Sequence, residues 1–298
     1  MRAIFQWNIG SRVLELGRRT LIMGVVNVTP DSFSDGGQFL DAGKAVAHAE
    51  RLLADGAAII DVGGESTRPG AKTGGAEAAN ATISEEEERN RVVPVIRDLK
   101  KKHPKAVISV DTYKAGVARA AVEVGAEVVN DISGFRWDQK MAKTLAELKI
   151  GAVLMHTRGR PEEWRKLPPV GDPVLLVKRE LRQFAEAATL AGVKRDRLVL
   201  DPGFGFGKSF EENYPLLAHF AELQQVGFPL LAGVSRKSFI GRALARDGKD
   251  APVDDRLYGT IAAETILILK GAHIVRTHDV RMAVEAARLG DAIVASGG

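Results

Sequence analysis

The chain alternates between short apolar runs and longer segments whose apolar residues recur with helical spacing. Each apolar run ends in a polar residue, and the eight runs that we expect to form strands span residues 21–27, 57–65, 106–112, 127–132, 151–156, 197–203, 229–235 and 273–279. Residues 42–57 and 174–192 are examples of the helical pattern between them. Apolar strands that alternate with amphipathic helices predict a parallel sheet covered by helices. Eight such units in 298 residues predict an α/β fold, a single (β/α)8 TIM barrel. An open doubly wound sheet is the alternative, because a sequence does not show closure.

The first residues have the pattern of a β-hairpin rather than of a barrel unit. Residues 4–17, "IFQWNIGSRVLELG", place two short strand-like runs on either side of Gly10. We expect this N-terminal β-hairpin to close the bottom of the barrel. The chain is therefore interpreted as one domain over 1–298, with the hairpin in 1–18 and the barrel in 19–298.

Two helices carry further signals. Ser84 and Glu87 have the spacing of a capping box at a helix start, and Pro94 in the same helix predicts a kink. The helix expected within 256–272 is apolar or small around nearly its whole circumference, although a barrel helix needs only one apolar stripe. We therefore expect a symmetric homodimer built on that helix. Coverage of the helix by the chain's own N-terminal hairpin is the alternative.

Composition narrows the class of protein. The hydrophobic fraction is 45% and the formal net charge is +4, too small an excess to predict a nucleic-acid partner, although it mildly favours an anionic small substrate. The absence of cysteine excludes disulfides, thiol nucleophiles and cysteine-type zinc sites. Neither a signal-peptide pattern nor an apolar run of membrane-spanning length is evident, so we expect a cytoplasmic protein without a membrane partner.

Two loops are longer than compact domains usually carry. They are residues 27–41 after the first strand and residues 66–82 after the second. Loops of such length are commonly functional. Both are rich in Gly, Ser and Thr and poor in apolar anchors, so we expect them to become ordered only around a bound diphosphate.

Polar residues follow the expected strands at the end where a barrel carries its active site. They are Asn27, Asp61, Glu65, Asp111, Asn130, Asp131, His156, Asp201, Ser235, Arg236, Lys237, Arg276 and His278. Among them, two carboxylates, an amide and an ammonium suit the amide and amino edges of a flat heterocycle such as a pterin; these are Asp111, Asp201, Asn130 and Lys237. An ion pair between Lys237 and an aspartate is the structural alternative.

A second group of residues suits an anion. Arg276 and His278 are two positions apart on a strand, point the same way and predict a grip for a phosphate or a diphosphate. Thr67 and Arg68 of the second loop would add contacts to the same anion. Pairing of Arg276 with Asp279 or another neighbour is the structural alternative.

Asn27 offers one neutral oxygen at a strand end. Alone it does not hold a metal ion, but with a diphosphate supplying most of the oxygens it would complete a Mg2+ shell. The six histidines have no zinc-site spacing.

Residues 201–209, "DPGFGFGKS", resemble a nucleotide-binding P-loop only in part. The P-loop pattern requires a glycine where this chain has Pro202. We expect the glycines of this loop to let the backbone approach flat ligands. Lys208 is assigned no role and is expected to be exposed to solvent.

Seven motifs, in this order and spread over nearly the whole chain, resemble the dihydropteroate synthase family. They are "MGVVNVTPDSFSDGG", "DVGGESTRPGA", "VDT", "VVNDISG", "DPGFGFGK", "SRKSFIG" and "THDV". The resemblance implies a TIM barrel, usually a homodimer, in folate biosynthesis. It implies a transferase that condenses (7,8-dihydropterin-6-yl)methyl diphosphate with 4-aminobenzoate to 7,8-dihydropteroate and diphosphate, requires Mg2+ and is a sulfonamide target.

The resemblance also implies roles for individual residues. Asn27 is implied as the magnesium ligand and Thr67 as a diphosphate contact. The implied pterin contacts are Asp111, Asn130, Asp201 and Lys237. The implied anion site is Arg276 with His278, and these two complete the catalytic group with Asp111, Asp201 and Lys237. The implied walls of the aminobenzoate pocket are Phe33, Pro69, Phe206 and Ser238.

Two other functions remain open at this point. A pterin-dependent methyltransferase on the same barrel would share the Asp and Asn pterin contacts but would need neither the "RTHD" grip nor the first long loop. A non-catalytic pterin-binding paralogue would be expected to have lost ligands, and this sequence retains every residue carried over from the family motifs.

Overall fold

The computed structural model of the protein describes residues 2–28, 38–65 and 83–297. Eight parallel strands form the central sheet: β3 (Leu21–Asn27), β4 (Ile59–Gly63), β5 (Val107–Asp111), β6 (Val128–Asp131), β7 (Gly151–Met155), β8 (Leu198–Asp201), β9 (Leu231–Ala232) and β10 (Ile274–Thr277). All eight expected strands are confirmed. Each is as long as its predicted range or shorter, and four of them end on an expected polar residue: Asn27, Asp111, Asp131 and Asp201.

The sheet closes on itself apart from one weak seam. Its strands run in the order β8-β7-β6-β5-β4-β3-β10-β9. The first barrel strand in the sequence, β3, therefore pairs with the last one, β10. Across the seam, Leu200 bridges Leu230 in parallel, and the Leu200 amide donates to the Pro229 carbonyl over 2.9 Å. The nearly closed barrel is therefore the correct alternative, and the open sheet is excluded.

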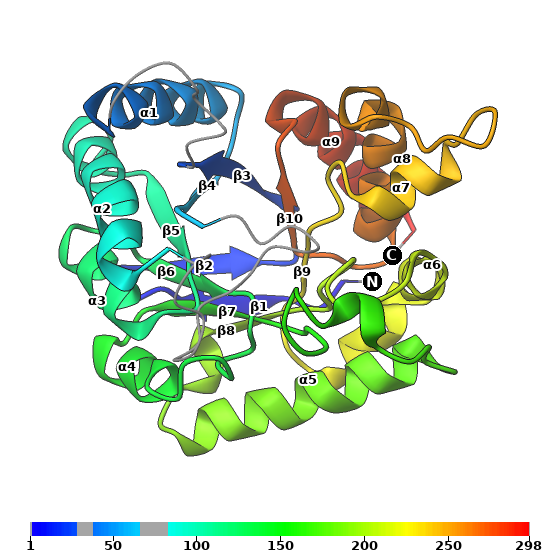
Figure 1. Ribbon diagram of the computed structural model, residues 1–298, viewed down its shortest axis with the longest axis horizontal. Coiled ribbons are helices and arrows are strands. Elements are labelled where there is room, and N and C mark those ends of the chain that lie inside the picture. The colour runs from blue at the N-terminus through cyan, green and yellow to red at the C-terminus, as the bar shows by residue number, and fades with distance from the viewer. Residues whose placement is uncertain (1, 29–37, 66–82, 298) are drawn as a thin grey trace.

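Helices form a ring around the strands (Figure 1). They are α1 (Gln38–Ala54), α2 (Glu85–Lys102), α3 (Ala115–Glu123), α4 (Met141–Leu148), α5 (Pro173–Leu190), α6 (Phe210–Ala218), α7 (Ser238–Ala243), α8 (Leu257–Leu269) and α9 (Val280–Ser296). Short 3-10 turns lie between them: η2 (Trp164–Lys166), η3 (Arg195–Arg197), η4 (Phe220–Val226) and η5 (Val253–Arg256). No helix in the described ranges combines the length and apolar character that a membrane crossing needs.

The start of α2 satisfies only half of the predicted capping box. The Ser84 hydroxyl accepts from the Glu87 amide over 3.0 Å, as expected. The Glu87 carboxylate pairs instead with Arg91, one turn along the helix. The helix continues through Pro94, and the kink there stays a prediction.

The N-terminal hairpin closes one end of the barrel, as expected. Strands β1 (Phe5–Asn8) and β2 (Val13–Leu16) pair antiparallel across a turn in which Gly10 has a φ of +91°. Trp7, Ile9 and Leu16 are buried against the first inward-facing residues of all eight barrel strands. The Trp7 indole donates to the Arg197 carbonyl over 2.9 Å, so the hairpin is held in the barrel by apolar contacts and by a hydrogen bond.

Candidate active site

Inward-facing positions change from apolar to polar along the strands. Side chains alternate between the two faces of a strand, so positions two apart face the same interior. Ile274 faces the hairpin at the bottom, and Arg276 is the next inward residue of the same strand. The same step occurs on four further strands: Ile59 to Asp61, Val107 to Ser109 and Asp111, Val128 to Asn130, and Val199 to Asp201. The inward-facing residues at the carboxyl end of the barrel are therefore polar, and this cluster is called the polar chamber: Asp61, Ser109, Asp111, Asn130, Asp201 and Arg276.

Arg276 is the centre of a charged network in this chamber. Its Nε donates to Asp61 Oδ2 and its Nη2 to Asp111 Oδ2, both over 2.7 Å. Asn130 Nδ2 donates to the same Asp61 oxygen over 2.9 Å. Asp279 pairs with Arg236, so the structural alternative for Arg276 is realised with two other neighbours, Asp61 and Asp111. Four residues from four strands are thus held in one fixed arrangement.

Asp61 is a member of this network to which the sequence assigned no role. It is fully buried, and its Oδ1 has no hydrogen-bond partner within the described part of the chain. A buried carboxylate oxygen without a partner is costly, so it is a place where a ligand's N–H would be stabilised. One signal for this role was present in the sequence: Asp61 lies two residues before Gly63, on the face of β4 that points into the barrel.

The turn after β9 separates two cations. Arg236 has a φ of +58°, a conformation that is strained for a residue with a side chain. This strained turn points the Arg236 guanidinium outward to Asp279 and leaves Lys237 at the chamber. Ser238, the next residue, is half-buried at the start of α7. Directly after the neighbouring strand β10, His278 Nδ1 lies 3.0 Å from the Ser235 hydroxyl, which places the imidazole beside this turn.

Lys237 is joined to the loop that follows β8. Its ammonium donates to the Phe204 carbonyl and lies 4.6 Å from the centroid of the Phe206 ring. The ring of Trp164 contacts Phe206 edge-on, with centroids 5.2 Å apart. The ion pair to an aspartate that was the alternative for Lys237 is absent from the described residues. Phe206 and Lys237, both predicted site residues, are therefore neighbours.

Two glycines of this loop are required by contacts within the protein, and their approach to a flat ligand stays a prediction. A Cβ at Gly203 would lie 2.0 Å from the His156 carbonyl oxygen, and one at Gly207 would lie 2.4 Å from that of Arg158. Both glycines also have positive φ values. They allow the loop to pack on the protein's own backbone after β7. Asp201, at the start of the loop, accepts from the Gly203 amide over 2.7 Å.

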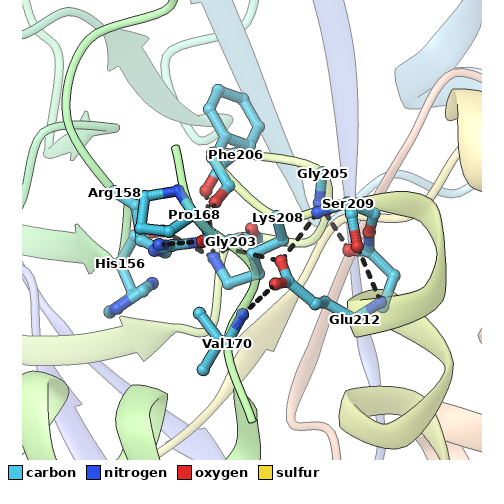
Figure 2. Close-up of polar contacts among 12 residues, drawn as sticks. His156, Arg158, Pro168, Val170, Gly203, Gly205, Phe206, Lys208, Ser209 and Glu212 are labelled. Carbon is cyan, nitrogen blue, oxygen red and sulfur yellow. Dashed lines mark hydrogen bonds and ion pairs between the residues drawn. The ribbon is translucent and has the colours of Figure 1, made fainter. Parts of the chain in front are cut away.

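Lys208 was expected to be exposed to solvent, and this prediction is wrong. The residue is half-buried, and its ammonium donates to the carbonyls of Gly203 (2.8 Å), Phe206 (3.2 Å) and His156 (3.4 Å). Burial, with Lys237 and Arg158 nearby, lowers the pKa of Lys208 well below its usual range, although the charge of Asp201 opposes this shift. Figure 2 shows this ammonium among the loop carbonyls. The prediction failed because residues that accept from Lys208 lie up to 52 positions away in the sequence.

Asn27 and Asp111 lie on either side of Gly63. A Cβ at Gly63 would lie 3.4 Å from the Asp111 Cβ and 3.8 Å from Asn27 Oδ1. Within the described residues no group of three or more His, Asp or Glu could hold a metal ion. A single amide oxygen fits a cation whose other ligands come from a bound anion and water.

Burial moves the pKa values of an acid and a base in the chamber toward neutrality. Burial raises the pKa of Asp111 to about 7, with the negative charge of Asp61 adding to the shift and Arg276 opposing it. Burial lowers the pKa of Lys237 to about 8, against the attraction of Asp201. Burial also raises the pKa of Asp201. Groups shifted in this way are typical of sites where protons are exchanged with a ligand.

Other predicted residues do not enter the chamber. Glu65 pairs with Lys114 over 2.6 Å, and buried His156 lies 3.0 Å from Glu180 of α5. Asp131 is the outward-facing neighbour of Asn130 and accepts from the Ser133 amide. Four predicted contacts, and most of the two long loops, lie outside the described residues: Phe33, Thr67, Arg68 and Pro69.

Known proteins match this arrangement over nearly the whole chain. Residues 23–278 match the family described as pterin binding enzyme. The dihydropteroate synthase of Clostridium beijerinckii is 44% identical over 96% of this chain and 98% of its own, and that of Escherichia coli is 42% identical over 92% of each. The solved Xanthomonas albilineans dihydropteroate synthase with 4-aminobenzoic acid has a TM-score of 0.86 and 41% identity, covering 98% of this chain and 99% of its own. The same protein solved with 7,8-dihydropteroate has a TM-score of 0.80 and 39% identity, covering 94% and 96%. The chain belongs to the pterin-binding enzyme family.

Proposed function

We propose that this protein is a dihydropteroate synthase, which joins (7,8-dihydropterin-6-yl)methyl diphosphate to 4-aminobenzoate and releases diphosphate. The observation that carries the proposal is the polar chamber, where a hydrogen-bonded network of residues from three other strands surrounds Arg276. Relatives that are more than 40% identical over nearly their full lengths are dihydropteroate synthases. The expected cytoplasmic location stays a prediction.

The pterin edge is assigned to four residues. The carboxylates of Asp111 and Asp201 would accept from the ring N–H and amino groups, while Asn130 and Lys237 would donate to the ring oxygen and nitrogen. These pairings satisfy buried polar groups at the edge of a flat ring, and a ligand without that edge would leave them unpaired. The near-neutral pKa values of Asp111 and Lys237 suit a ligand whose ring takes up positive charge during the reaction.

The anion would bind at Arg276 and His278, with Thr67 and Arg68 of the second loop. Asn27 would hold Mg2+ together with diphosphate oxygens, and the ion, when bound, supplies charge stabilisation to the leaving group. Burial, with Arg276 and Arg236 nearby, lowers the pKa of His278 to about 4 in the unliganded protein. A neutral imidazole is therefore available to donate to an incoming anion or to be protonated by its approach.

The chemistry is expected to be dissociative. The bond between the methylene carbon and the diphosphate oxygen breaks with its electron pair on oxygen, and the dihydropterin ring delocalises the positive charge that remains. Asp111 and Asp201 favour that cation electrostatically, while Arg276 and His278 stabilise the departing charge. The amino nitrogen of 4-aminobenzoate then forms the new C–N bond and loses one proton. Phe206 and Ser238, with Phe33 and Pro69, would form the walls around the aminobenzoate.

Product formation tests the proposal directly. Purified protein with Mg2+ should release diphosphate only when both substrates are present, and 7,8-dihydropteroate should appear in equal amount. Diphosphate release without 4-aminobenzoate would indicate hydrolysis rather than synthesis. Binding of a pterin without either product would support a non-catalytic paralogue, and methyl transfer from a folate would support the methyltransferase.

A homodimer is proposed from the outer surface of α8 and α9. These helices pack together, and they expose apolar side chains that the N-terminal hairpin does not cover: Tyr258 (85% exposed), Ile266 (38%), Leu269 (44%), Leu289 (64%) and Ile293 (48%). An apolar surface of this kind is commonly buried by a second copy. Light scattering should give about twice the 32.0 kDa monomer mass, and Ile266→Asp should reduce it to the monomer value. A monomeric wild-type protein would refute the dimer.

A further inference from the structure

The loop between β8 and α6 is held by cations along nearly its whole backbone. Carbonyls of Gly203 and Phe206 accept from Lys208, that of Phe204 accepts from Lys237, and that of Gly207 accepts from Arg158 over 3.1 Å. Four of the five carbonyls from Gly203 to Gly207 are therefore fixed by three positive groups. Figure 2 shows two of these groups, Lys208 and Arg158, on the same loop.

Lys208 differs from Arg158 in its surroundings. Arg158 also lies 3.7 Å from the Glu212 carboxylate, whereas the hydrogen bonds of the Lys208 ammonium are to main-chain carbonyls. One of these carbonyls belongs to His156, which directly follows β7, so the ammonium joins the loop to the neighbouring strand. Burying an ammonium in this way is costly, and an apolar side chain would fill the same space more cheaply. Here three carbonyl dipoles surround the charge, so the ammonium and the carbonyl positions are coupled.

The position that Lys208 fixes is that of the Phe206 ring. The Phe206 carbonyl accepts from Lys208, and the Phe206 amide donates to the Gly203 carbonyl over 3.1 Å, which also accepts from Lys208. Both ends of the short turn that carries the ring are therefore bound to one ammonium. On its other side the ring faces Lys237.

We propose that Lys208 is a positioning residue of the active site: it holds the Gly203–Phe206 turn against the end of β7 and thereby sets the Phe206 wall of the aminobenzoate pocket. The inference rests on the proposed function for the identity of that pocket. It assigns to Lys208 a contribution to 4-aminobenzoate binding, although its ammonium is directed at the protein's own backbone and touches neither substrate.

Steady-state kinetics of Lys208→Met test the proposal. Methionine keeps the length of the side chain and removes its donors. KM for 4-aminobenzoate should rise by about tenfold or more, as expected when a positioned group shifts by about 1 Å. KM for the pterin diphosphate should change by less than about twofold. Lys194→Met, at an exposed lysine before β8, is the matched control and should leave both values unchanged. Equal rises in both KM values, or none, would overturn the proposal.

A double-mutant cycle separates positioning from a general loss of structure. If Lys208 acts through Phe206, Lys208→Met should add little to the KM for 4-aminobenzoate once Phe206→Ala is present, because coupled residues are not additive. Fully additive effects would contradict the proposed route. Lys208→Arg retains charge and donors, and it should recover part of the affinity that Lys208→Met loses.

Hydrogen exchange gives a readout that does not depend on activity. Amides of residues 203–207 should exchange faster in Lys208→Met, while those of β5 and β6 keep wild-type rates, which shows that the variant is folded. Unchanged exchange in the loop would overturn the positioning role, whatever the kinetics. If the wild-type protein made no dihydropteroate but the variant loosened the loop, the proposed function would fail while the backbone role of Lys208 stood.

Discussion

The two ends of the barrel interior are built from the same strands but have opposite chemistry. At the bottom, Trp7 of the hairpin packs among apolar residues, and its one polar atom is satisfied by the Arg197 carbonyl. At the top, Arg276 is set between Asp61 and Asp111, and buried oxygens of Asp61 and Ser109 lack partners within the described residues. Apolar side chains of the hairpin and the strands fill the bottom, whereas the top leaves hydrogen-bonding capacity for a ligand.

The difference shows how a strand contributes to stability and to binding at once. In β10, Ile274 belongs to the apolar end and Arg276 to the charged one, although they are only two positions apart. The apolar end supplies burial that favours folding, and it offsets the cost of placing charges inside the protein. Substitutions at the bottom should therefore change stability first, and substitutions at the top should change activity first.

The largest effect is expected at the bottom. Trp7→Ala should lower the free energy of unfolding by about 3–5 kcal/mol, because it removes a buried indole and leaves a cavity. In the protein that remains folded at low temperature, kcat should be unchanged. Denaturant unfolding and kinetics on the same sample check both statements. Val13→Ala, at a half-exposed position of the same hairpin, should change stability by less than about 0.5 kcal/mol. A loss of kcat in folded Trp7→Ala would break the division between the two ends.

The next largest effect is expected at the top. Arg276→Ala should lower turnover by about 10²-fold or more, as the loss of a preorganised charge typically does. Arg281→Ala removes an arginine whose ion pair with Glu285 is exposed, and it should leave turnover intact. Initial rates at saturating substrates measure the effect. Near-normal turnover of Arg276→Ala would remove this residue from the proposed anion site.

A smaller effect concerns the layer outside the barrel. Burial raises the pKa of Glu264 on α8 to about 8, with Asp279 adding to the shift and Thr277 opposing it. The side chain is fully buried. A raised folded-state pKa stabilises the protein at low pH and less as pH rises from about 4.5 through about 8. Relative to Glu264→Met, wild-type stability should fall by about 1.4 kcal/mol between pH 6 and pH 7.

Urea unfolding of both proteins across this pH range measures that slope. Glu285→Met, which removes an exposed glutamate of α9, should show no comparable slope. A flat difference between the wild-type protein and Glu264→Met would show that Glu264 is charged in the folded state at neutral pH.

The smallest effect is the uptake of at most about one proton. Because the pKa of unliganded His278 is lowered to about 4, the imidazole is neutral at pH 6. A bound diphosphate should raise that pKa and cause uptake of up to about one proton at this pH. Calorimetry in two buffers with different ionisation enthalpies measures the uptake. His278→Asn should abolish it. Uptake that persists in this variant would assign the proton to another group.

Local patterns predicted the barrel well, whereas long-range pairings lay beyond them. The strands and the hairpin follow from periodicity, which neighbouring residues determine. The residues of the upper chamber were found because strand ends meet on one face of a barrel. Asp61 received no role because its partner Arg276 is 215 positions away. The burial of Lys208 was missed for the same reason, because one of the carbonyls that accept from it belongs to His156, which directly follows β7.

The clamped arrangement of Arg276 has a consequence for the thermodynamics of binding. A free arginine side chain has about 2 kcal/mol of rotamer entropy to lose when it grips a ligand. Here Asp61 and Asp111 remove that freedom when the chain folds, before any ligand arrives. Ligand binding at this guanidinium would therefore begin from a single orientation, and ordering of the side chain should reduce the binding free energy only slightly. The two aspartates therefore preorganise Arg276: they fix its orientation when the protein folds, before a ligand binds.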